Sequence, residues 1–171
     1  MREANGKVGV RSSGLAMAPA VFAWLGQTAA VDWTVLLAAN AFNLLVTGVF
    51  CCRKLGYRRA EYLQGILCLL LFFPVLWAIR TNWRLGRPAW SVGLPLMLLV
   101  FLVVGFVLDY HLALDFRHSR WLWPHFLAFF AAQWSLIGYA FIVSRKWGCL
   151  TLATYLACLG SSWWAHSGRG T

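Results

Sequence analysis

Two long stretches of this chain contain no charged side chain. The sequence has no Asp, Glu, Lys or Arg between Glu61 and Arg80, and none between Arg87 and Asp109. Each stretch is close to the ~20 residues that a helix needs to cross the ~30 Å hydrocarbon core of a bilayer. A helix buried in a soluble protein is usually shorter and seldom so uniformly apolar. These stretches therefore predict an integral membrane protein.

The composition supports the same class of protein. Hydrophobic residues make up 61% of the chain and charged residues only 12%, whereas soluble domains carry roughly 25% charged residues. The net charge is +10, but Lys and Arg flank the apolar stretches, which predicts contact with lipid headgroups and not with nucleic acid. The five cysteines form no C-x-x-C pair and their number is odd, so no disulfide framework or zinc site is implied. We expect neither a cofactor nor a bound metal.

The apolar segments predict an all-α bundle of six transmembrane helices in a single membrane domain that covers residues 1–171. Five segments have the length and apolar character of spans: 31–52, 62–79, 88–108, 121–144 and 148–165. Segment 14–30 is ambiguous between a sixth span, an interfacial helix and a signal peptide. A sixth span requires a tight turn near Asp32, and five spans are the alternative. Pro74 and Pro95 are expected to kink their helices because proline removes a backbone hydrogen bond.

The distribution of basic residues favours six spans. If segment 14–30 crosses, ten of the fifteen Lys and Arg residues fall on one side and five on the other; if it does not, the division is seven against eight. A two-to-one bias is typical of a settled topology under the positive-inside rule. We therefore predict a multi-pass protein with both termini in the cytoplasm.

Polar side chains within the spans form two helical stripes. Asn40, Asn43 and Thr47 follow i, i+3, i+7 spacing and share one helix face. They are candidates for lining a polar cavity and binding a ligand, but we favour interhelical hydrogen bonds, which contribute roughly 0.6 to 2 kcal/mol each in such bundles. The second stripe consists of small residues and predicts a packing seam. Its members are Thr151, Thr154, Cys158 and Ser161.

The segment after the fourth span is rich in titratable side chains. If the helix continues, His111, Asp115 and His118 share a face at i, i+4, i+7, and His125 approaches from the next span. This set suits an acid/base relay; a metal site lacks a fourth ligand, and anchoring at the membrane interface is the simpler alternative. These four residues are the catalytic candidates. Nearby candidates for binding a ligand are Asp109, Arg117 and Arg120.

The loop between the third and fourth spans carries three arginines at helical spacing. Arg80, Arg84 and Arg87 are interleaved with Trp83 and Trp90. Arginine forks bind phosphate, so the three are candidate residues for binding a lipid phosphate or diphosphate. An aromatic belt with basic anchors is the favoured alternative, and it also explains most of the eleven tryptophans.

Three function classes follow by elimination. Loops are short, and no G-x-x-x-x-G-K-[ST] or G-x-G-x-x-G run is present, which argues against a nucleotide-binding domain. An intramembrane enzyme that modifies a lipid or isoprenoid is slightly favoured. A binding, sensory or assembly subunit for a hydrophobic ligand or partner is the alternative, and a carrier or channel component is a second one, weakened by the scarcity of charges inside the spans. Membrane lipids are the expected partners, and a homo-oligomer is left open.

Overall fold

A computed structural model describes residues 17–108 and 122–167, with the backbone alone described for 17–25 and 122. Within these ranges every regular element is a helix and there is no strand, which confirms the all-α prediction. The helices are α1 (Met17–Leu55), α2 (Arg58–Leu70), α3 (Phe72–Arg84), α4 (Trp90–Phe106), α5 (Leu122–Val143) and α6 (Arg145–His166).

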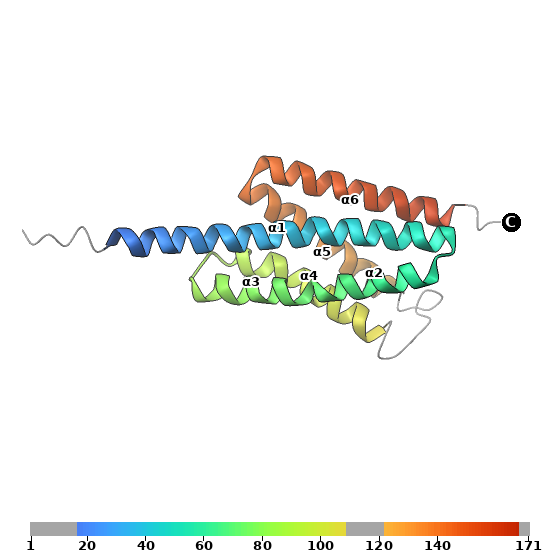
Figure 1. The fold of residues 1–171 in the computed structure, drawn as a ribbon, viewed down its shortest axis with the longest axis horizontal. Helices are drawn as coiled ribbons and strands as arrows, with labels where there is room; N and C mark the ends of the chain where they lie inside the picture. The colour runs from blue at the N-terminus through green and yellow to red at the C-terminus, as the bar shows by residue number, and fades with distance from the viewer. Residues whose placement is uncertain (1–16, 109–121, 168–171) are drawn as a thin grey trace, which may run out of the picture.

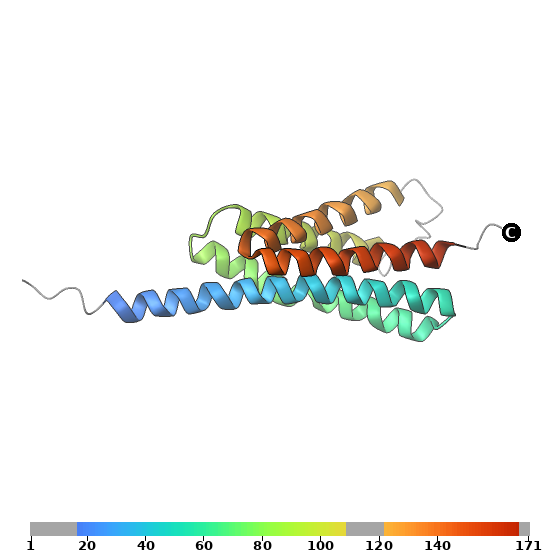
Figure 2. The same ribbon diagram turned by 90° about the horizontal axis from the view of Figure 1, so that it is seen from above.

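The helices form a bundle of roughly antiparallel rods (Figures 1 and 2). α2 and α3 follow one another along a single line, which runs back beside α1. α4 then runs beside α3 in the opposite direction, and α6 lies along α1. α5 packs between α4 and α6. We call the end where α1 gives way to α2 the α1–α2 end; α4 and α6 also finish there. The opposite end, with the α3–α4 loop and the α5–α6 turn, is the α3–α4 end (Figure 1).

The break between α2 and α3 lies at Leu71 and has a proline as its cause. Pro74 has no N–H to donate to the carbonyl of Leu70, so the helical hydrogen bonds lapse there. The amide of Leu71 bonds instead to the carbonyl of Cys68 at 3.2 Å, and the amide of Val75 resumes the pattern with the carbonyl of Leu71 at 3.2 Å. The interruption expected at Pro74 is thus present, whereas α4 runs unbroken through Pro95.

Three helical stretches are long and apolar enough to cross a membrane: Gly26–Leu55, Arg58–Arg84 and Trp123–Val143. Trp90–Phe106 is apolar but shorter. Large apolar side chains such as Leu37, Phe73 and Trp134 are exposed on the outside of these helices, where water would disfavour them and lipid would not. The described residues therefore support a membrane helix bundle, but they do not support the six-span count.

The tight turn predicted near Asp32 is wrong. α1 is one continuous helix of 39 residues, so the described part of segment 14–30 and the predicted span 31–52 belong to the same element. No glycine or proline lies between Gly26 and Gly48 to end the helix. At 1.5 Å per residue α1 is about 58 Å long, and its first turns extend past the bundle (Figure 1).

Two clusters of buried apolar residues hold the bundle together. One joins the middle of α1 to α2, α3, α4 and α5, around Phe42, Leu98 and Leu136. The other lies toward the α3–α4 end and includes Val31, Ala78, Tyr139 and Ala140. The second cluster includes Tyr139, whose hydroxyl donates a hydrogen bond to Asp32.

Candidate functional site

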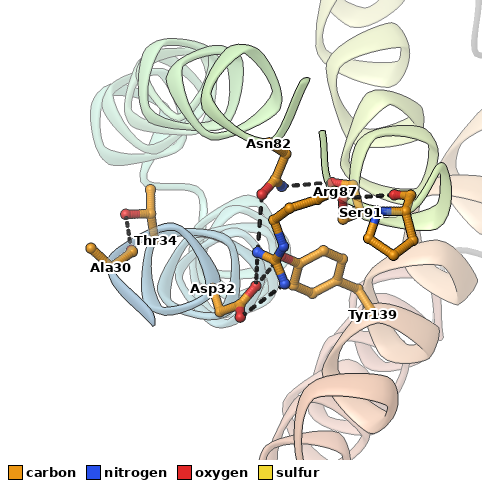
Figure 3. Close-up of polar contacts among 8 residues, drawn as sticks. Ala30, Asp32, Thr34, Asn82, Arg87, Ser91 and Tyr139 are labelled. Carbon is orange, nitrogen blue, oxygen red and sulfur yellow. Dashed lines mark hydrogen bonds and ion pairs between the residues drawn. The ribbon is translucent and has the colours of Figure 1, made fainter. Parts of the chain in front are cut away.

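A connected group of polar side chains surrounds Asp32, on α1 at the α3–α4 end (Figure 3). Arg87, from the α3–α4 loop, binds the carboxylate in a two-point contact: Nη1 donates to Oδ1 at 2.7 Å and Nη2 to Oδ2 at 3.1 Å. The hydroxyl of Tyr139, from α5, donates to Oδ1 at 2.6 Å. Paired, charge-assisted bonds of this kind are stronger and more directional than neutral ones. The carboxylate thus joins three separate parts of the chain.

The guanidinium of Arg87 also contacts side chains of the two helices that its loop connects, α3 and α4. Nη1 also donates to Oδ1 of Asn82 at 3.0 Å, and the amide of Asn82 donates to the carbonyl of Ser91 at 2.8 Å. The guanidinium carbon lies 5.8 Å from the centre of the Trp90 ring, which meets the ring of Tyr139 edge-on at 5.4 Å. We call Asp32, Asn82, Arg87 and Tyr139 together the Asp32 clamp.

The Asp32 clamp is largely shielded from solvent. Asn82 and Tyr139 are fully buried, and the side chains of Arg87 and Asp32 retain only 11% and 19% of their exposure. Burial by itself would lower the pKa of Arg87, but the hydrogen bonds and negative charge of Asp32 outweigh it and raise the pKa above its ordinary value. Arg87 therefore stays protonated, and its contact with Asp32, together with the hydrogen bond from Tyr139, fastens α1 to the α3–α4 loop and α5.

The three arginines noted at helical spacing do not share a helix face. α3 ends at Arg84, and Gly86 takes a positive φ of 62°, which turns the chain out of the helix. Arg87 consequently points inward to Asp32, while Arg80 and Arg84 are exposed. The ligand-binding role predicted for Arg80, Arg84 and Arg87 stays a prediction.

Sequence reasoning missed three of the clamp residues: Asp32, Asn82 and Tyr139. A signal for Asp32 was present: it is a lone carboxylate in an apolar stretch, and such a charge requires a cationic partner. Tyr139 had no comparable signal, because a tyrosine within a span is also an ordinary interfacial or core residue.

The two polar stripes seen in the sequence face one another between α1 and α6. Asn40 Nδ2 donates to Thr151 Oγ1 at 3.2 Å, and Asn43 Nδ2 donates to Thr154 Oγ1 at 3.0 Å. The hydroxyl of Thr154 lies 3.0 Å from Asn40 Oδ1 and donates toward it. We call these four residues the Asn–Thr seam. Its bonds are the interhelical hydrogen bonds favoured from the sequence; a ligand-binding role for Asn40 and Asn43 stays a prediction.

His125 is the one catalytic candidate among the described residues. It is half-buried in the second turn of α5 at the α1–α2 end. Its ring lies 5.1 Å from the ring of Phe101 on α4, and its Cε1 atom faces Gly105, 4.0 Å from where a Cβ would stand. The side chain therefore points between α4 and α5.

The remaining candidates lie outside the described residues, and their roles stay predictions: His111, Asp115, His118, Asp109, Arg117 and Arg120. Within the described ranges, no three His, Cys, Asp or Glu side chains gather where they could hold a metal ion. Comparisons with protein-family models, with curated proteins and with solved structures gave no match to this chain.

Proposed function

We propose that the chain is a multi-pass membrane protein in which five segments cross: α1, α2 with α3, α4, α5 and α6. The three apolar stretches support it directly, and α4 and α6 run alongside them over much of the bundle (Figures 1 and 2). Six spans would require α1 to cross twice, which one continuous helix does not support. With five spans the N-terminus and the C-terminus lie on opposite sides of the membrane.

Epitope tags placed at the two ends test this topology. In sealed inverted vesicles, five spans expose one tag to protease and protect the other, whereas the six-span alternative gives both tags the same accessibility. A cytoplasmic loop tag inserted after Gly56 calibrates the orientation of the vesicles.

We propose further that the protein acts on a lipid or isoprenoid at the α1–α2 end. The observation that carries this is the place of His125 at this end of the bundle, where its imidazole lies against Phe101 and Gly105 of α4. An imidazole there is suited to moving a proton near neutral pH. Segment 109–121, which contains His111, Asp115 and His118, joins α4 to α5 immediately before His125.

The test is turnover of a membrane-lipid extract by the purified protein. His125→Gln, His111→Ala and Asp115→Asn are expected to abolish turnover while the protein stays folded. His166→Gln is the matched control: this histidine also lies at the α1–α2 end, but it is exposed and bonded to the carbonyl of Ser162 in its own helix. Loss of activity in the control as well as in the three variants would contradict a specific role for His125.

A non-enzymatic binding or assembly subunit is the second candidate, and one observation favours it. Within the Asp32 clamp the polar side chains hydrogen-bond to one another, and the same is true within the Asn–Thr seam. Both groups therefore hold helices together. Because Asn40 and Asn43 are bonded to α6, their side chains are not available to line a pathway for a transported solute. A folded protein that retains lipid but consumes none across a broad lipid panel would establish the binding function over the enzymatic one.

A further inference from the structure

A shallow, open hollow of about 380 Å³ lies at the start of α2, at the α1–α2 end. Arg58, Arg59, Tyr62 and Leu63 line it, and we call it the basic hollow. Its accessible wall is apolar, so the two arginines contribute their aliphatic stems and their guanidinium groups lie outside the wall. Long basic side chains commonly divide in this way between an apolar surface and a polar one.

The charges of Arg58 and Arg59 are not neutralised within the described chain. The neighbouring carboxylate, Glu61, forms an ion pair with Arg53, whose Nη2 and Nε atoms lie 2.6 and 2.8 Å from Oε1. Lys54 donates to the carbonyl of Ser167. Both hollow arginines are exposed and form no ion pair with any described residue. Two adjacent guanidinium groups therefore remain available to an anion.

The local backbone adds to this preference for an anion. Arg58 and Arg59 are the first two residues of α2, where the helix dipole is positive, and the residue before them makes no side-chain cap. The helix end alone would not define a ligand. Here it coincides with two unpaired guanidinium groups and an apolar wall, and this combination matches an amphiphile with an acidic head.

We propose that the basic hollow binds an anionic phospholipid, with its phosphate at Arg58 and Arg59 and its glycerol and upper acyl chains against Tyr62 and Leu63. This rests on the proposed membrane topology, which puts the start of α2 at the level of the headgroups. Exposed aromatic residues at the same end, Tyr57 and Trp163, are typical of that level. A free phosphate or a nucleic acid would leave the apolar wall unused.

The test uses the full-length protein in neutral detergent micelles, with lipid adducts counted by native mass spectrometry. Short-chain phosphatidylglycerol and phosphatidylcholine are the two probes. The wild type is expected to retain the phosphatidylglycerol in preference to the phosphatidylcholine. Arg58→Gln/Arg59→Gln is expected to lower retention of phosphatidylglycerol by roughly tenfold or more, because each basic residue near an anionic headgroup contributes appreciably to binding.

Arg145→Gln/Lys146→Gln provides a closely matched control. These two exposed cations occupy the first two positions of α6, as Arg58 and Arg59 do in α2, but they lie at the α3–α4 end. This variant is expected to retain phosphatidylglycerol within about twofold of the wild type, as befits surface positions outside the site. Leu63→Gln keeps both arginines and removes part of the apolar wall; it is expected to lower retention several-fold, and it tests the hollow even if the double arginine variant does not fold.

Three results would overturn the proposal: equal losses in the two double variants, equal retention of the two lipids by the wild type, or full competition by glycerol phosphate without acyl chains. The outcome is separable from that of the proposed catalytic function. Absence of turnover together with an intact preference for phosphatidylglycerol would contradict the catalytic proposal alone. A topology that fails the tag experiment while the lipid preference persists would likewise distinguish the two proposals.

Discussion

Arg87 binds Asp32 through both of its terminal nitrogens across 55 residues of sequence, with nitrogen–oxygen distances of 2.7 and 3.1 Å. The pair explains how a carboxylate is tolerated within a long apolar helix. A single charge at that position would be costly without a partner, and Arg87 supplies the partner from a neighbouring loop. The chain therefore does not need to turn at Asp32 to bring the charge out of the membrane helix.

Replacement of Asp32 by Asn should destabilise the bundle. The change removes the negative charge and leaves the shielded guanidinium of Arg87 without its counter-ion, so we expect a loss of about 2 kcal/mol in the free energy of unfolding. Arg87→Gln should cost a similar amount. Unfolding in detergent, followed by loss of helical circular dichroism, gives both values.

The double variant Asp32→Asn/Arg87→Gln separates this pair from unrelated damage. Because both changes break the same contact, their effects should fall short of additivity by about 1 to 3 kcal/mol. Arg80→Gln removes an exposed arginine from the same end of the bundle and should change stability by no more than about 0.5 kcal/mol. Strict additivity of the two clamp substitutions would mean that the contact does not contribute to folding.

Tyr139→Phe isolates the third bond to the carboxylate. The substitution keeps the edge-on contact with Trp90 and removes only the hydroxyl that donates to Asp32 at 2.6 Å. A hydrogen bond to a charged acceptor contributes about 1.5 to 3 kcal/mol, and we expect a loss in that range. In an Asp32→Ala background the same change should be neutral or stabilising, because the buried hydroxyl would then have lost its acceptor. An undiminished loss in that background would assign the effect of Tyr139→Phe to packing.

Thr154→Val tests the Asn–Thr seam at its most connected member. Valine preserves the shape of threonine but can neither accept from Asn43 nor donate toward Asn40. Interhelical hydrogen bonds in membrane bundles average ~0.6 kcal/mol and reach ~2 kcal/mol, so two of them should give a measurable loss of about 1 to 2 kcal/mol. Thr34→Val is the control, since the hydroxyl of Thr34 is exposed and bonds only within α1. Equal effects of the two substitutions would show that the seam adds nothing to helix association.

The two polar stripes show that helical periodicity predicts which residues share a helix face, but not which helices pack against one another. Spacing placed Asn40 and Asn43 on one face of α1, and Thr151 and Thr154 on one face of α6, and both faces are as expected. These two faces meet because α1 and α6 are neighbours in the bundle, although the bonded residues are more than 100 positions apart in the sequence. A single sequence carries no local signal for that choice, because every span offers an apolar surface on which another could pack.

The wrong prediction of a turn and the divergence of the three arginines both have local causes. The turn at Asp32 was inferred from charge counting across the whole chain, although the residues around it lack the glycine or proline that usually ends a helix. Arg80, Arg84 and Arg87 follow helical spacing but share no helix face, because Gly86 lies between the last two and turns the chain. In both cases the residues that form or break a helix locally were the better guide. Helical content and the presence of long apolar helices followed from the length of the uncharged stretches together with the composition.

The α5–α6 turn offers a last test, at a glycine on which a phenylalanine ring rests. A Cβ added to Gly148 would stand 2.3 to 2.4 Å from two ring carbons of Phe141, which is far inside van der Waals contact. Gly148→Ala should therefore force the ring aside or spread the turn, at a cost of about 1 to 3 kcal/mol. Gly138→Ala, in the middle of α5, meets nothing within 4 Å and should stabilise the helix by up to about 1 kcal/mol.

A second substitution distinguishes this steric explanation from any special role of glycine in the turn. In a Phe141→Ala background the space above residue 148 is vacated, so Gly148→Ala should become neutral or stabilising, like Gly138→Ala. Gly148 has no positive φ, and its backbone conformation is therefore compatible with alanine. If the loss persisted without the ring, the cost would have to arise from the backbone of the turn, and the close approach of Phe141 to Gly148 would not be what determines the residue at this position.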